Sequence, residues 1–353
     1  QGGSTAYRDD YGAEEEGATP ADSHYQVLTL AQPAAGDYTL VVAAGKDGSV
    51  EAGAGYDVEV EAQGETPLAF NGGTEVVVNQ SQDTWRYFRV EVPAGALGWD
   101  LRLEDVTAGE PALVVRRDLL PDAFTTTSNL QNKDNWPSGD HFQAFSDWTE
   151  RYLSASGVTE RNRVLTVGMG SPLEPGTYYV GVKNRSSGSG GDMSYTLVSR
   201  GIGEGLDGGG QPWAIEVQPL AFAGGVANGT GLAPRDIAVY KVEVPVGSRS
   251  WSLRLDPAAG HEALLAVRHG KVPNITADHS ISGGYASDYS ASPNGGQQGV
   301  KRQKNGSEYF YKYQANTSVD GTITPGWYYV VVASEGQNPA SATRIGTGSV
   351  DYV

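Results

Sequence analysis

The chain has 353 residues, a formal net charge of −17 and no cysteine. The length fits two or three domains, the acidic balance disfavours nucleic-acid partners, and the lack of cysteine excludes disulfides, thiol catalysis and zinc–thiolate sites. No apolar run reaches the roughly 18 residues of a membrane-spanning helix. Glycine is frequent, with 48 residues, and short alternating runs rich in Thr, Val, Tyr and Ser predict many strands and turns.

The first 63 residues carry only the late strands of a β-sandwich. The runs Gly36-Asp37-Tyr38-Thr39-Leu40-Val41-Val42 and Tyr56-Asp57-Val58-Glu59-Val60 predict strands over 38–43 and 56–61. We therefore interpret residues 1–63 as the C-terminal half of a repeat. Unpaired strand edges invite pairing with another chain, so we expect the missing half to come from upstream polypeptide or from a neighbouring subunit. In the second case a filament could grow head to tail.

Two complete copies of the repeat follow, at residues 64–200 and 214–353. At a nearly constant offset the second copy repeats three runs of the first, namely Pro67-Leu68-Ala69-Phe70 as Pro219-Leu220-Ala221-Phe222, Trp99-Asp100-Leu101-Arg102-Leu103 as Trp251-Ser252-Leu253-Arg254-Leu255, and Pro175-Gly176-Thr177-Tyr178-Tyr179 as Pro325-Gly326-Trp327-Tyr328-Tyr329. Such self-similarity is typical of tandem modules. The two copies should superpose strand by strand, with Trp99 matching Trp251 and Arg116 matching Arg268.

Alternation within these runs predicts an all-β, two-sheet sandwich. Trp99 and Leu101 point to one face of a strand while Arg102 points to the other, which is the pattern of a half-buried strand. Between the two copies, the Gly-rich residues 201–213 predict a flexible linker or turn. Residues 203–208 match a dinucleotide-binding fingerprint formally, but without a βαβ context they indicate a spacer.

Catalytic motifs are missing from the sequence. It contains neither His-Glu-x-x-His nor Gly-x-Ser-x-Gly, so the parts of a zinc hydrolase or a serine hydrolase are not assembled. We therefore expect the chain not to be an enzyme and to carry no catalytic residue.

Three aspartates recur in the same loop of each repeat, namely Asp10, Asp147 and Asp288. A short carboxylate in a turn usually accepts hydrogen bonds from backbone N–H groups. Calcium is the alternative, because hard oxygen ligands suit an acidic, cysteine-free chain. No Asp-x-Asp-x-Asp ladder accompanies the three residues, and no other cofactor is predicted.

Aromatic residues gather in the long loops and late strands of both complete copies. The candidates for ligand binding are Trp136, Trp148, Tyr289, Tyr309, Tyr311 and Tyr313. The last three alternate and so share one face of a predicted strand. Such rings either cover the ends of the sandwich as part of the core, or form an exposed platform for a sugar or a partner surface.

The order of these elements resembles the bacterial pre-peptidase C-terminal domain. This family consists of extracellular jelly-roll β-sandwiches and includes the collagen-binding modules of secreted collagenases. The matching runs of the first complete copy are Asp83 to Phe88, Val90 to Gly95, Val115 to Pro121, Ser146 to Trp148, Pro175 to Val182 and Tyr195 to Leu197. The resemblance implies tandem jelly-roll-like antiparallel sandwiches. The loops over 120–163 and 272–306 are longer than the family's usual connection.

These observations predict a non-catalytic structural or adhesive repeat module, part of a longer bacterial surface protein, stalk or filament. Its expected partners are neighbouring repeats or copies of itself, and its expected location is extracellular or at the cell surface. The alternative is a targeting module of a secreted hydrolase that binds polysaccharide or a fibrous protein.

Overall fold

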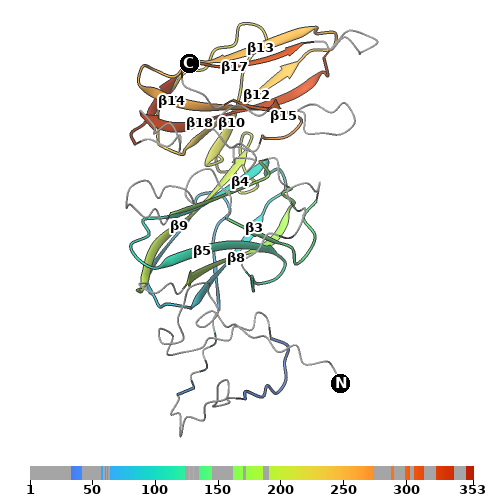
Figure 1. Cartoon of the computed structure of the whole chain (residues 1–353). Coiled ribbons are helices and arrows are strands. Elements are labelled where there is room, and N and C mark those ends of the chain that lie inside the picture. Colours follow the sequence, from blue (N-terminus) through green and yellow to red (C-terminus); the bar gives the residue numbers. More distant parts are fainter. Residues whose placement is uncertain are drawn as a thin grey trace, which may run out of the picture.

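The computed structural model describes residues 33–41, 57–58, 60, 62, 64–123, 127, 130, 135–144, 162–169, 172–185, 191–273, 288–289, 299–302, 306–313, 323–337 and 347–353, with the backbone alone at 288–289, 299–302 and 312–313. These residues form two stacked β-sandwiches (Figure 1). The all-β class predicted from the sequence is confirmed. In the described part of the chain, no helix has the length and apolar character needed to cross a membrane.

In its described residues the first sandwich contains nine strands: β1 (Glu65–Pro67), β2 (Gly73–Gln80), β3 (Trp85–Val92), β4 (Gly98–Glu104), β5 (Glu110–Arg117), β6 (His141–Gln143), β7 (Arg163–Val167), β8 (Gly176–Arg185) and β9 (Met193–Gly203). One sheet has the order β1-β3-β8-β5-β6, and the other contains β2, β9, β4 and β7. Trp99, Leu101, Leu113, Tyr178 and Val180 are fully buried between the sheets. The alternating apolar residues therefore build the core, as the sequence pattern predicts.

The part of the second sandwich that the structure describes contains ten strands: β10 (Ile215–Pro219), β11 (Gly229–Leu232), β12 (Ile237–Val244), β13 (Ser250–Leu255), β14 (His261–His269), β15 (Asp288–Tyr289), β16 (Gly299–Arg302), β17 (Glu308–Tyr313), β18 (Gly326–Gln337) and β19 (Val350–Tyr352). One sheet has the order β15-β16-β14-β18-β12-β10. Opposite it lie two pairs, β11-β19 and β13-β17. Its core includes Trp251, Phe310 and Tyr328.

The strand registers of the two sandwiches coincide at the repeated positions. Arg116 pairs with Tyr179 across β5 and β8, and Arg268 pairs with Tyr329 across β14 and β18. Likewise, β4 pairs with β7 through Trp99, and β13 pairs with β17 through Trp251. The match of strand to strand predicted by the repeat is confirmed at these positions.

Residues 201–213, the joint between the two sandwiches, contain the end of β9 and a turn closed by hydrogen bonds between Asp207 and Gln211 and between Gly210 and Asp207, so a turn, one of the two predicted alternatives, is found here. β9 runs on to Gly203, and β10 pairs in parallel with β9 and, on its other edge, with β12. The ring of Trp213 packs over Gly201 and Gly203, where an added Cβ would stand only 2.9 and 2.3 Å from its nearest ring atom. Gly201 and Gly203 therefore make room for a buried ring, whereas Gly205 and Gly210 have positive φ and lie in the turn.

A third apolar cluster fills the space between the two sandwiches. The first sandwich contributes Met169 and Ile202, and the second contributes residues from the outward face of its larger sheet, such as Val239, Leu264 and Val331. β18 is consequently buried on both faces along most of its length. Burial of this apolar surface fixes the two sandwiches to each other.

The predicted half repeat at residues 1–63 is described only in part. The described residues 33–41, 57–58, 60 and 62 contain no strand, so the strands predicted over 38–43 and 56–61 are not found in those positions. The side chains of Tyr38 and Leu40 are 58% and 55% exposed, whereas their counterparts Tyr178 and Val180 are fully buried. A strand needs a paired edge and an apolar face to pack on, and no described strand lies against this segment. The rest of the half repeat lies outside the described residues.

Candidate functional site

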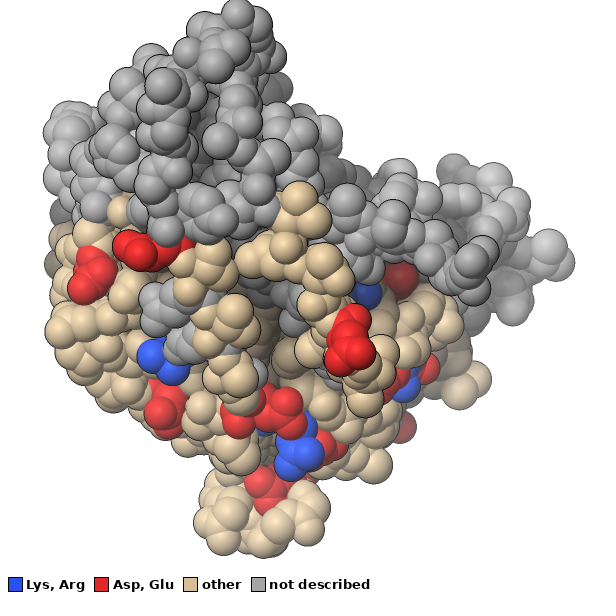
Figure 2. Space-filling view, turned by 90° about the horizontal axis from the view of Figure 1, so that it is seen from below, with Lys and Arg blue, Asp and Glu red and all other residues tan. Residues whose placement is uncertain are grey.

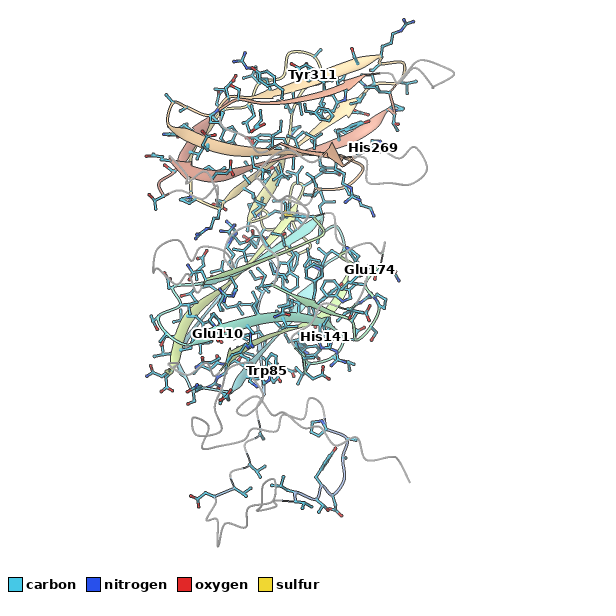
Figure 3. All side chains as sticks on the ribbon, in the orientation of Figure 1. Trp85, Glu110, His141, Glu174, His269 and Tyr311 are labelled. Carbon is cyan, nitrogen blue, oxygen red and sulfur yellow. The ribbon has the colours of Figure 1, made fainter. Side chains whose placement is uncertain are left out.

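Two of the predicted aromatic residues come together on the outer face of the second sandwich. The register of β13 and β17 places Arg254 opposite Tyr309 and Ser252 opposite Tyr311. Because side chains alternate along a strand, these four residues share one face while Phe310 points into the core. Tyr311 lies on the side of the second sandwich that is remote from the joint (Figure 3). We call this surface, formed by Ser252, Arg254, Tyr309 and Tyr311, the tyrosine platform.

The two tyrosine rings of the platform lie parallel to each other. Their centroids are 6.1 Å apart and their planes differ by 5°. The Tyr311 side chain is 62% exposed, and the guanidinium carbon of Arg254 lies 5.7 Å from the Tyr309 centroid. Aromatic faces of this kind can stack on a sugar ring or another planar group, and a nearby arginine can bind a carboxylate in two places.

Arg254 is held in place by Asp256, just after β13, and Asp256 is in turn bound by Ser307, just before β17. Its Nε donates to Asp256 Oδ1 at 2.7 Å, and the Ser307 hydroxyl donates to the same oxygen at 2.6 Å. The hydrogen bond to Asp256 raises the pKa of Arg254. The hydrogen bond from Ser307, together with Arg254, lowers the pKa of Asp256. Both groups therefore stay charged at neutral pH, and the cation of the platform is permanent.

The equivalent face of the first sandwich is covered by the second. There Arg102, the counterpart of Arg254, is buried and donates from Nη2 to the backbone oxygen of Arg235 at 2.8 Å. Arg200 Nη2 lies 2.7 Å from Asp236 Oδ1, so both arginines of the first sandwich reach the second. The alternation in the sequence predicts that Arg102 faces outward, but it does not predict this contact.

Asp100 holds the two arginines from the other side. Its carboxylate is fully buried and lies 2.7 Å from Arg102 Nε and 3.1 Å from Arg200 Nη2. Burial opposes its ionisation, but the attraction of Arg102 and Arg200 outweighs burial and lowers the pKa of Asp100. The joint thus contains a buried network of charged side chains that connects the first sandwich to the second.

Trp136 is not part of an exposed platform, and this candidate is corrected. Its side chain is fully buried, and its ring packs against Phe142 and Tyr178 with centroids 5.7 and 5.0 Å away. Its Nε1 donates to the backbone oxygen of Asp140 at 2.8 Å. A ring without an exposed face cannot stack on a ligand, so Trp136 belongs to the core.

The other predicted site residues cannot be placed at the platform. Trp148, Asp10 and Asp147 lie outside the described residues. Asp288 and Tyr289 form β15, and Tyr313 ends β17, but only their backbones are described. The calcium prediction for the three aspartates therefore stays a prediction.

Charged groups elsewhere on the described surface bind one another. Asp122 lies 2.8 Å from Arg116 Nη1 and 2.9 Å from His141 Nε2, and the hydrogen bond with His141 is the largest influence that lowers the pKa of Asp122. No group of three or more metal-binding side chains occurs among the described residues. On the face seen from below, acidic side chains predominate on the described surface, with few basic ones between them (Figure 2).

Comparisons with known proteins leave the family open. No protein-family model and no curated protein matches the chain. Among solved structures, a surface-associated copper-binding protein of Methylomicrobium album BG8 matches with a TM-score of 0.22 and 12% identity, over 39% of this chain and 98% of its own. Tripeptidyl peptidase 2 matches with a TM-score of 0.22 and 9% identity, over 81% of this chain and 27% of its own.

The CUB1-EGF-CUB2 domains of rat MASP-1 match with a TM-score of 0.21 and 9% identity, over 82% of this chain and 99% of their own. At these TM-scores the three matches carry no argument about the present chain. The resemblance to the pre-peptidase C-terminal domain stays a prediction.

Proposed function

We propose that the chain is a non-catalytic structural or adhesive module of an extracellular or cell-surface protein, in which β-sandwich repeats stack rigidly on one another. The observation that carries this proposal is the joint. Strand pairing through β10 is continuous from the first sandwich to the second, and an apolar cluster and a charged network connect the two.

A rigid joint suits a stalk better than a chain of independent binding domains. Domains within one chain usually move relative to each other unless their interface is large and apolar. Here an apolar cluster, a charged network and the backbone pairing of β10 connect the two sandwiches, so we expect their spacing to be fixed. Repeats joined in this way transmit a fixed orientation along an array.

Distance measurements between two spin labels test the rigidity. The chain has no native cysteine, so Val78→Cys and Val246→Cys introduce one label on each sandwich, at side chains that are 66% and 88% exposed. We expect a single narrow distance distribution that is unchanged between low and high salt. A broad or bimodal distribution would contradict the stacked module. Antibody labelling of intact cells of the source organism tests the surface location separately.

A second function, ligand binding, is favoured by the tyrosine platform. The platform supplies two parallel rings and an arginine on an exposed face, which suits a polysaccharide or a fibrous protein. Glycan and collagen arrays should then detect binding that Tyr311→Ala weakens and Tyr311→Phe preserves. Val246→Ala, another exposed position, serves as the matched control. Equal binding by all three variants would exclude the platform as the binding surface.

A further inference from the structure

Strand β2 of the first sandwich has one edge that no other described strand pairs with. On its paired side it runs antiparallel to β9, from Thr74 opposite Val198 to Val77 opposite Tyr195. On the other side none of the described strands lies against it. An unpaired strand edge presents a row of backbone N–H and C=O groups that another strand can bind.

The outward side chains along this edge are apolar and open to solvent. Val76 and Val78 are 64% and 66% exposed, and Thr74 before them is exposed as well. Because side chains alternate along a strand, these three lie in one row on the same face. Natural edge strands are commonly blocked by lysine or proline, and β2 contains neither.

The sequence of this edge is typical of strands that pair with their own copies. Four of the five residues at 74–78 are β-branched, and the run contains one charged residue and no glycine. High β propensity with little charge is the pattern of self-pairing segments. The counterpart in the second sandwich, residues 226–230, reads Val-Ala-Asn-Gly-Thr, and Ala, Asn and Gly disfavour strands. The self-pairing pattern is therefore a property of the first sandwich at this position.

The faces and charges of β2 select one register for such a pair. Two copies related by a two-fold axis form a continuous sheet only if outward residues lie opposite outward residues. With Glu75 at the centre, two carboxylates would face each other, which is destabilising. With Val77 at the centre, the pairing would include Asn79, which has a φ of 55° and lies where the register of β2 shifts. The register centred on Val76 avoids both.

We propose that the free edge of β2 is a contact surface for a second copy of this chain. The two β2 strands pair antiparallel, with Val76 opposite Val76 of the second copy. Thr74 of each copy then faces Val78 of the other, so that the outward side chains form one continuous row across both molecules. The contact uses neither the joint nor the tyrosine platform, and it does not depend on the proposed function.

The net charge of the chain sets how this contact responds to salt. Each copy carries a formal charge of −17, so two copies repel each other in dilute buffer. A stable interface engages about 20–30 residues on each side, whereas this edge offers only residues 74–78. The association is therefore weak, and added salt strengthens it by screening the repulsion. A contact built on ion pairs would weaken in salt instead.

Sedimentation velocity of the full chain at low and high salt tests the association. We expect a dimer whose fraction grows with protein concentration and with salt. Val76→Lys places two like charges opposite each other at an exposed position and should abolish the dimer. Val226→Lys is the matched control, because Val226 is 69% exposed in the counterpart of this run, and it should leave the dimer unchanged. A chain that stays monomeric at about 1 mM, or a dimer that both variants affect equally, would overturn the proposal.

Disulfide formation in a chain without native cysteine tests the register. Val76→Cys brings the two substituted positions directly opposite each other, at a Cα separation of about 4.5–5.5 Å, which a disulfide can span. Val78→Cys is almost equally exposed, but its two copies would lie four residues apart along the strands, about 14 Å. We expect mild oxidation to link the first variant into dimers quickly and the second slowly. Equal rates of linking would overturn the proposed pairing.

Discussion

Replacing Gly203 by alanine tests whether the joint depends on close contact with Trp213. An added Cβ would lie 2.3, 2.5 and 2.6 Å from three atoms of the indole, whereas carbon atoms in contact are separated by about 3.5–4.0 Å. The ring must therefore retreat by about 1 Å. Its space is limited, because the Trp213 side chain is only 6% exposed and packs edge-on against Phe70 at 6.3 Å.

The expected loss of stability follows from two opposing effects. Overpacking of this kind costs about 1–3 kcal/mol, while the reduced backbone freedom of alanine in the unfolded chain restores about 0.4–1 kcal/mol. We expect Gly203→Ala to lower the free energy of unfolding by about 1–2 kcal/mol. Trp213→Ala, which removes the ring altogether, should lower it by about 3–5 kcal/mol.

Urea denaturation followed by tryptophan fluorescence measures these differences. Gly208→Ala is the matched control, because an added Cβ at Gly208 meets nothing within 4 Å. The control should stay within about 0.5 kcal/mol of the wild type. In the spin-label experiment, Gly203→Ala should also broaden the distance distribution between the sandwiches. If Gly203→Ala and Gly208→Ala were equally stable and gave equally narrow distance distributions, the contact between Gly203 and Trp213 would be refuted as the basis of the joint.

Three further substitutions address the charged network and the cores. Asp100→Asn should cost about 3–5 kcal/mol at pH 7. Because the folded pKa of Asp100 is lowered, its contribution is complete above the unfolded pKa of about 3.9 and is lost as the pH falls through the folded value. Urea titrations at pH 7 and pH 3 should therefore show a smaller difference at the lower pH. Tyr352→Phe removes the 2.8 Å hydrogen bond to Tyr240 and should cost about 1–3 kcal/mol by thermal denaturation, and the double variant with Tyr240→Phe should recover part of it. Trp136→Ala should destabilise the first sandwich by about 3–5 kcal/mol. It should leave ligand binding by the folded protein unchanged, which the glycan and collagen arrays can check at a temperature below the melting transition.

The repeat made most of the strand pairing predictable. Period-two alternation in Trp99, Leu101 and Leu103 identified the inward face, and the offset between the copies predicted that Arg268 would occupy the place of Arg116. These predictions hold because the burial of an inward side chain is decided by strands of the same sandwich. The alternation that reveals it can be read within a single strand.

The joint was not predictable in the same way. Glycine has two different uses, flexibility and close approach, and composition does not distinguish them. At Gly201 and Gly203 the deciding partner is Trp213, which approaches from beyond the intervening turn. Similarly, the aromatic pattern could not separate buried Trp136 from exposed Tyr311, because burial depends on which other residues cover each side chain.

The contrast between Arg102 and Arg254 shows how position in an array changes the use of one residue. Both follow the same Trp-x-Leu-Arg-Leu run and point outward, but Arg102 is covered by the second sandwich while 62% of the Arg254 side chain is exposed. The outward face of β13 lies at the end of the stack remote from the joint (Figure 1). A further repeat seated there as the second sandwich is seated on the first would cover the tyrosine platform. Stacking and ligand binding would therefore compete for the platform, and a ligand could be held only by a sandwich whose outer face is free.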